Sequence, residues 1–81
     1  MDGAGMVTQC LIPGDGGSMV YNFTVGDQVG TYWWHAHYAS QYADGLRGPF
    51  IIQDPDDPYK SLYDEELIIT LGDNFHRTSA E

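Results

Sequence analysis

Basic residues are scarce in this chain. Only three lysines and arginines stand against twelve aspartates and glutamates, so the formal net charge is −9 at pH 7. Proteins recognise nucleic-acid backbones and anionic membrane surfaces mainly through lysine and arginine. The shortage therefore argues against both kinds of partner, and it is consistent with a protein that meets cations.

Cysteine and long apolar runs are also in short supply. Cys10 is the single cysteine, so no disulfide can close within the chain. Cys10 is then either a buried thiol or one half of a bridge whose partner lies elsewhere. No apolar stretch reaches the roughly 20 residues of a membrane-spanning helix. The first five residues have neither the basic region nor the apolar core of a signal peptide.

One motif nevertheless points to the secretory pathway. Asn22-Phe23-Thr24 is an N-glycosylation sequon, which has a meaning only in that pathway. A secretory mark in a chain that begins without a signal peptide leads us to expect a piece of a longer protein.

Helical periodicity is missing, and short β-like segments take its place. Residues 18–25 alternate between apolar and polar positions, as a half-buried strand does. Further strands are predicted at residues 30–37, 49–53 and 67–71, with a shorter extended segment within 6–12. Glycine and proline turns separate them, at residues 13–17, 26–28, 44–48 and 54–58. Four or five short strands at this spacing predict an all-β sandwich or Greek-key barrel.

The most informative stretch is Gly30-Thr31-Tyr32-Trp33-Trp34-His35-Ala36-His37. Aromatic and β-branched residues favour a strand, in which alternate side chains share a face. His35 and His37 then lie on one face, about 6.6 Å apart at their Cα atoms. From that spacing two imidazoles can converge on one metal or reach two neighbouring metals. They could also form a hydrogen-bonded pair without a metal, and the spacing does not select copper over zinc.

Several motifs together match a known family in order and spacing. They are Met1-Asp2-Gly3, Thr8-Gln9-Cys10, Tyr21-Asn22-Phe23-Thr24-Val25, the eight residues from Gly30 to His37, Gln41-Tyr42, Asp44-Gly45-Leu46-Arg47-Gly48 and Tyr63-Asp64-Glu65-Glu66-Leu67. The chain thereby resembles the first cupredoxin domain of multicopper oxidases, most closely the fungal laccase and iron-oxidase branch. The resemblance implies that residues 1–81 form an incomplete cupredoxin-like Greek-key β-sandwich or barrel that lacks its first strands.

The resemblance also implies roles for particular residues. His35 and His37 would each bind a different copper of the type 3 pair in a trinuclear cluster. Asp2 matches a carboxylate near that cluster that assists proton delivery while dioxygen is reduced to water. From the residues alone, a loop-capping role for Asp2 is an equal alternative. The implied cofactor is copper, and the implied electron donor is a phenol or ferrous iron, met outside the cell or at its surface.

Other residues receive plainer interpretations. Cys10 is not the blue-copper cysteine, because that ligand belongs to a His-Cys-His context that this sequence lacks. His76 is read as structural. Leu11 stands where the family leads us to expect proline, and residues 72–75 are less aromatic than the family pattern. None of these features affects the assignment of His35 and His37.

The resemblance leads us to expect further parts elsewhere in a longer chain. These are a second His-x-His motif upstream of Met1, the other cluster ligands, the blue-copper site and the remaining cupredoxin domains. We therefore expect the 81-residue chain alone to lack oxidase activity.

Two other hypotheses stay open from the sequence. In the first, the His35–His37 pair holds a single zinc or copper ion, with Asp2, His76 or Cys10 as a third ligand, in a non-catalytic module. In the second, the chain is a truncated β-fragment that binds nothing and associates through open strand edges.

Overall fold

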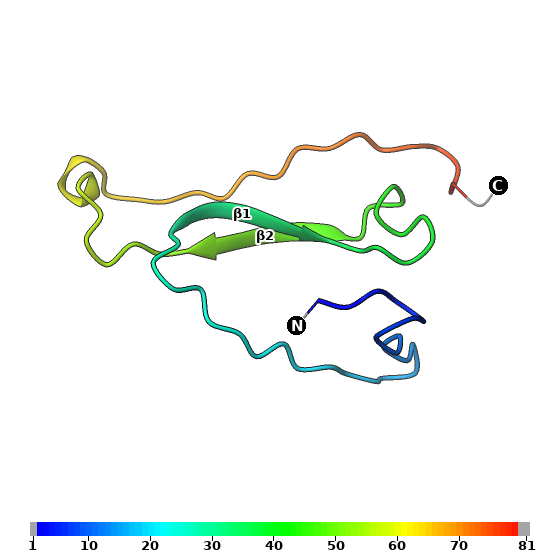
Figure 1. The fold of residues 1–81 in the computed structure, drawn as a ribbon. Coiled ribbons are helices and arrows are strands. Elements are labelled where there is room, and N and C mark those ends of the chain that lie inside the picture. Colours follow the sequence, from blue (N-terminus) through cyan, green and yellow to red (C-terminus); the bar gives the residue numbers. More distant parts are fainter. Residues whose placement is uncertain (1, 80–81) are drawn as a thin grey trace.

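A computed structural model describes residues 2–79 of the chain (Figure 1). Strand β1 covers Gly30–His35 and strand β2 covers Arg47–Ile52, and the two pair antiparallel in a two-stranded sheet. A single 3-10 turn, η1, follows at Lys60–Leu62. The expected all-β character is confirmed, since η1 is the only helical element among residues 2–79.

The register of the sheet defines a histidine face. The residue pairs on this face are Thr31 with Ile51, Trp33 with Pro49, and His35 with Arg47. Directly opposed residues of an antiparallel pair share a face, so Arg47 lies beside His35. Pro49 has no N–H to donate, and a strand paired on one side only tolerates that loss.

The opposite face is built around Trp34. Its indole lies over Gly48, where an added Cβ would stand 2.6 Å from the indole Nε1. Tyr32 opposes Phe50 on this face, and the ring of Phe23 lies 6.0 Å from that of Phe50. Gly48 is thus required by the close approach of Trp34, which explains a glycine inside a strand.

The connection between the strands, residues 36–46, is a hydrogen-bonded loop. The amide of Ala36 donates to the Leu46 carbonyl at 3.0 Å, and that of Leu46 donates to the Gln41 carbonyl at 2.9 Å. Gly45 has φ +103°, a left-handed conformation that glycine adopts without strain. These bonds fold the loop back toward the end of β1.

The prediction of four or five strands is wrong for this chain. Residues 18–25 and 67–71 run without a ladder partner, and residues 5–9 form a tight turn closed by a bridge between Gly5 and Gln9. Figure 1 shows the two unpaired stretches as extended arms on either side of the β1–β2 hairpin. Their sequences favour strands, but a ladder needs a second strand within hydrogen-bonding distance, and none of residues 2–79 supplies one.

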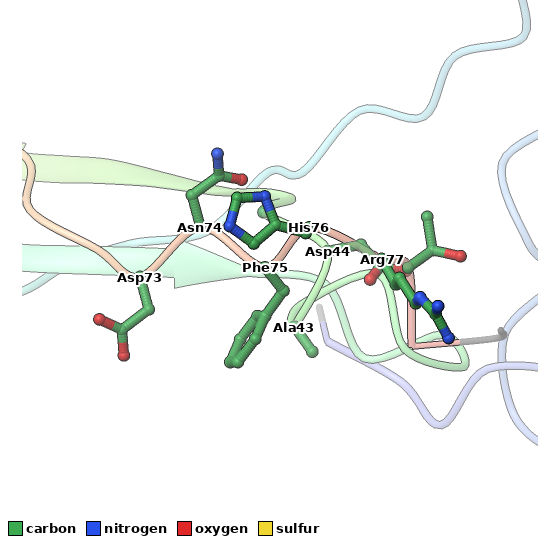
Figure 2. A pocket seen from close by; sticks show the side chains of 9 residues that line it. Ala43, Asp44, Asp73, Asn74, Phe75, His76 and Arg77 are labelled. Carbon is green, nitrogen blue, oxygen red and sulfur yellow. The ribbon is translucent and has the colours of Figure 1, made fainter.

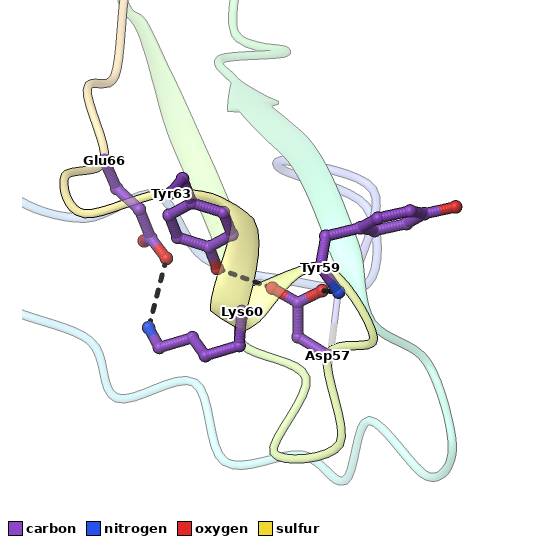
Figure 3. A network of polar contacts seen from close by, with 5 residues as sticks. All are labelled: Asp57, Tyr59, Lys60, Tyr63 and Glu66. Carbon is purple, nitrogen blue, oxygen red and sulfur yellow. Dashed lines mark hydrogen bonds and ion pairs between the residues drawn. The ribbon is translucent and has the colours of Figure 1, made fainter.

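The turns predicted at residues 13–17, 26–28 and 54–58 are confirmed. The turn predicted at residues 44–48 ends at Gly45 instead, because Arg47 and Gly48 belong to β2. The amide of Gln28 donates to the Val25 carbonyl at 3.2 Å, and Gly26 has φ +60°. In the acidic turn, the Asp54 carboxylate accepts from the Asp56 amide at 2.9 Å. The Asp57 carboxylate accepts from the Tyr59 amide at 2.8 Å and from the Tyr63 hydroxyl, and so closes the turn onto η1 (Figure 3).

Residues 2–79 enclose no buried side chain. The exposed surface is 7591 Å², whereas a compact monomer of 9.0 kDa exposes about 4,850 Å². The radius of gyration is 16.7 Å, against about 12 Å for a compact domain of this length. The ordered part of the fold is therefore the hairpin with its loop, and this part carries the two histidines.

No helix among residues 2–79 has the length and apolar character to cross a membrane.

Candidate metal centre

His35 and His37 lie together, as the strand pattern predicts. Strand β1 ends at His35, yet the alternation continues for two more residues. The imidazole rings stack with centroids 4.5 Å apart and planes 26° apart. His35 is half-buried and His37 is exposed, so solvent and ions reach the pair from the His37 side.

The geometry of the two rings bears on how many ions they serve. A metal–nitrogen bond of about 2.0 Å lies in the plane of the imidazole. The His35 and His37 planes are nearly parallel and lie one above the other. A single ion therefore cannot lie in both planes and also at bonding distance from a nitrogen of each ring. Two neighbouring ions suit this arrangement better than a single shared ion.

Aromatic rings surround His35 more closely than His37. The Trp33 ring lies 4.6 Å from the His35 ring, and the Tyr42 ring lies 4.5 Å from it. The Trp33 and Tyr42 rings are themselves 5.6 Å apart. We call Trp33, His35, His37 and Tyr42 the ring cluster.

The backbone also orients His35. Its Nδ1 lies 3.2 Å from the Ala36 carbonyl oxygen. When Nδ1 carries the proton it donates to that oxygen, and the Nε2 lone pair is then free for a metal. Fixing one ring nitrogen in this way sets the tautomer of a metal-binding histidine.

Asp2 is exposed at the start of the N-terminal segment, ahead of the turn at residues 5–9. Among residues 2–79, no three histidine, cysteine, aspartate or glutamate side chains gather closely enough to hold one ion. Asp2, Cys10 and His76 therefore do not complete a three-ligand site with the histidine pair. Cys10 is an exposed free thiol, so the first of its two predicted states, a buried thiol, is wrong, and a bridge to a partner elsewhere stays a prediction.

His76 lies apart from the histidine pair, at a shallow hollow between the 36–46 loop and the C-terminal segment. The hollow is lined by Ala43, Asp44, Gly45 and residues 73–78. Figure 2 shows Asp73 and Phe75 pointing to one side of that segment, with Asn74 and His76 on the other, as extended backbone requires. Ser79 donates to Asp44 through its amide at 2.9 Å and its hydroxyl at 3.2 Å, which holds the segment against the loop.

Tyr42 is the site residue that sequence reasoning did not single out. Its contact with His35 depends on the path of the 36–46 loop. The only signal was Gln41-Tyr42 among the motifs of the family pattern, which gave no role to the tyrosine.

Donor chemistry and surroundings fit copper. Neutral imidazole is a good ligand for that metal, and the indole of Trp33 and the phenol of Tyr42 limit solvent access to His35. The pair offers two donors, and no third histidine, cysteine, aspartate or glutamate joins them among residues 2–79.

The family model for multicopper oxidases matches residues 1–57. The iron transport multicopper oxidase FET3 of Candida albicans is 58% identical over 81 residues, which is 100% of this chain and 12% of that protein. The iron transport multicopper oxidase FET5 of Saccharomyces cerevisiae is 56% identical over 77 residues, covering 94% of this chain and 12% of that protein. Laccase-1 of Fomitopsis schrenkii is 51% identical over 82 residues, covering 98% of this chain and 15% of that protein. No solved structure matches the chain.

This chain belongs to the multicopper oxidase family. The fold class is therefore cupredoxin-like, the cofactor is copper, and the chain comes from a region that contributes to the copper sites. It spans only 12 to 15% of the length of these relatives.

Proposed function

We propose that this chain supplies two histidine ligands, His35 and His37, to adjacent coppers of the type 3 pair in an oxidase that reduces dioxygen to water. The observation that carries the proposal is the stacked imidazole pair at the end of β1, with centroids 4.5 Å apart and nearly parallel planes. Membership of the multicopper oxidase family supports copper as the metal.

Copper, when bound, supplies the one-electron chemistry that joins oxidation of a donor to reduction of dioxygen. The chain's own residues hold and orient the ligands. The Ala36 carbonyl sets the His35 tautomer, and Trp33 covers one side of the His35 ring. Asp2 carries a carboxylate that can hold and release a proton, and we assign it to proton delivery, since four protons must reach each dioxygen.

Ferrous iron and phenols are the two donor classes that we propose for the whole protein. Relatives named as iron transport oxidases and relatives named as laccases match the chain at comparable identity, from 51 to 58%. The proposed location is the cell exterior or surface. Asn22 supports it, because its side chain is exposed on an unpaired arm where a glycan has room. An unchanged mass after glycosidase treatment of the protein from a eukaryotic host would contradict glycosylation.

Copper retention tests the ligand assignment. The 81-residue chain is loaded with copper, dialysed against a weak chelator and assayed for copper per chain. We expect the His35→Ala/His37→Ala variant to bind at least about tenfold more weakly than wild type, because each imidazole is a direct ligand. His76→Ala is the matched control, a histidine outside the pair, and it should retain wild-type binding. Equal losses in both variants, or none in the double variant, would contradict the assignment.

A further inference from the structure

We propose that Tyr42 is a positioning residue that holds the His35 imidazole in its metal-binding orientation. This inference rests on the proposed function of His35 as a copper ligand. It concerns a loop residue that touches the ligand without binding metal itself.

The contact geometry singles out Tyr42. Its ring lies 4.5 Å from the His35 ring, tilted by 43°, and 5.6 Å from the Trp33 ring. Trp33 lies 4.6 Å from His35 along the same strand. His35 thus has an aromatic neighbour from its own strand and a second one from the loop, and rotation of its ring would break both contacts.

The loop holds Tyr42 where it is. The Tyr42 carbonyl accepts the Gly45 amide at 3.1 Å, and the Asp44 amide donates to the Ser40 carbonyl at 3.0 Å. The loop then closes on β1 through the bond from the Ala36 amide to the Leu46 carbonyl. Three backbone hydrogen bonds thereby fix the position of the tyrosine relative to the histidine strand.

Arg47 provides a second anchor for the tyrosine ring. Its guanidinium carbon lies 5.9 Å from the Tyr42 centroid, within the range of a cation–π contact. The same guanidinium donates to the Asp73 carbonyl at 3.4 Å. A Cβ at Gly72 would overlap the Arg47 Nη2, so glycine at this position lets the guanidinium reach the C-terminal segment.

The aromatic ring of Tyr42 carries this role, because no hydrogen bond from its hydroxyl accompanies the contact with His35 among residues 2–79. Tyr42→Phe should therefore preserve the positioning, and Tyr42→Leu should abolish it. Tyr38→Leu is the matched control, because Tyr38 is exposed to a similar extent in the same loop, but no ring contact joins it to His35 among residues 2–79.

The first measurement uses the metal-free chain. In an NMR spectrum, an aromatic ring 4.5 Å away shifts the His35 ring protons. We expect Tyr42→Leu to remove that shift, and Tyr42→Phe and Tyr38→Leu to keep it. Backbone amide signals of β1 and β2 report whether each variant keeps the hairpin. Unchanged His35 signals in Tyr42→Leu with the hairpin intact would overturn the proposal.

The second measurement is copper affinity of the same variants. Residues that orient a metal ligand typically contribute 10- to 100-fold to affinity. We expect a loss of that order in Tyr42→Leu and rescue in Tyr42→Phe, and a loss of the same size in Tyr42→Phe would overturn the role of the ring. If copper binding proves independent of His35, the proposed function fails, and the NMR result still decides whether the Tyr42 ring contacts the His35 ring.

Discussion

Tyr63 donates its hydroxyl proton to the Asp57 carboxylate at 2.5 Å, and Glu66 lies on the far side of η1 in an ion pair with Lys60 at 3.5 Å (Figure 3). The hydrogen bond to Asp57 is the main cause that raises the pKa of Tyr63 above its ordinary 10.0, and Glu66 adds to it. The same bond from Tyr63 lowers the pKa of Asp57 below 3.8, with help from the Tyr59 amide. The pKa of Glu66 falls below 4.5 through Tyr63 and then Lys60.

The signs of these pKa shifts define the pH range in which the acidic turn is held to η1. The lowered pKa of Asp57 contributes stability above pH 3.8, and that of Glu66 contributes stability above pH 4.5. Each contribution is lost as the pH falls through the lowered pKa of its carboxyl group. The raised pKa of Tyr63 contributes stability below pH 10, and this is lost as the pH rises through the raised value. The contact is therefore complete from about pH 5 to 10.

Neutralising Asp57 tests this account. In Asp57→Asn, the pKa of Tyr63 should return toward 10.0. The neutral hydroxyl then loses its charged hydrogen-bond acceptor, and the phenolate loses its repulsion from a carboxylate. Tyrosinate absorbance across a pH titration measures this, and Tyr63→Phe identifies the component that belongs to Tyr63. Asp56→Asn is the matched control, since the neighbouring Asp56 carboxylate accepts no bond from Tyr63. An identical Tyr63 titration in Asp57→Asn and wild type would refute the cause named here.

At the scale of elements, the β1–β2 hairpin is the unit that local sequence could predict. Aromatic residues and the opening Gly30 favour β1, and alternation correctly places Trp33, His35 and His37 on one face. The apolar run after Gly48 predicts β2 within two residues of its observed bounds. These properties depend on side chains a few positions apart.

Two other elements could not be predicted correctly, because strand formation depends on a partner. Residues 18–25 and 67–71 have β-like composition, but no strand lies alongside them within residues 2–79. The contact of Tyr42 with His35 was missed for a related reason. It arises from a loop conformation, in which Ala39 and Gly45 both have positive φ, and only Gly45 is of a type that signals one.

Gly48→Ala should destabilise the hairpin. The new Cβ would stand 2.6 Å from the Trp34 Nε1 and 2.8 Å from its Cε2, so the indole must leave its place over β2. We expect a cost of about 1–3 kcal/mol, the usual range for overpacking. Amide hydrogen exchange of β1 and β2 would measure it. Gly14→Ala is the control, because an added Cβ there meets no atom within 4 Å. Equal exchange in the two variants would contradict the expected clash.

At the scale of the whole molecule, the β1–β2 hairpin leaves many large apolar side chains exposed to solvent. The exposed area exceeds that of a compact monomer of this mass by about 2,700 Å². Leu67 and Leu71 are 82% and 88% exposed on the unpaired arm. Both long edges of the hairpin also leave backbone groups without a strand partner among residues 2–79. The net charge of −9 opposes association between copies.

We therefore expect the isolated 81-residue chain to associate in a manner that depends on salt. Salt screens charge repulsion, with a Debye length of about 10 Å at 0.1 M, but leaves the apolar attraction. Light scattering should show a mass that rises with concentration, and more steeply at high salt. Ile69→Lys should reduce the rise, because it removes an exposed apolar side chain from the arm. Ser61→Lys makes the same change in net charge outside the apolar arm and should not reduce it. A monomeric mass throughout would disprove the expectation.

The short connection between β1 and β2 has a kinetic consequence. His35 pairs with Arg47 across a loop that spans only residues 36–46. Closing a loop of about ten residues takes on the order of 10–100 ns, and a hairpin forms in about 1–10 μs. Contacts between segments distant in sequence form far more slowly. The two imidazoles can therefore reach their mutual arrangement early in folding, before slower pairing elsewhere, so that copper would meet a ligand pair that is already assembled.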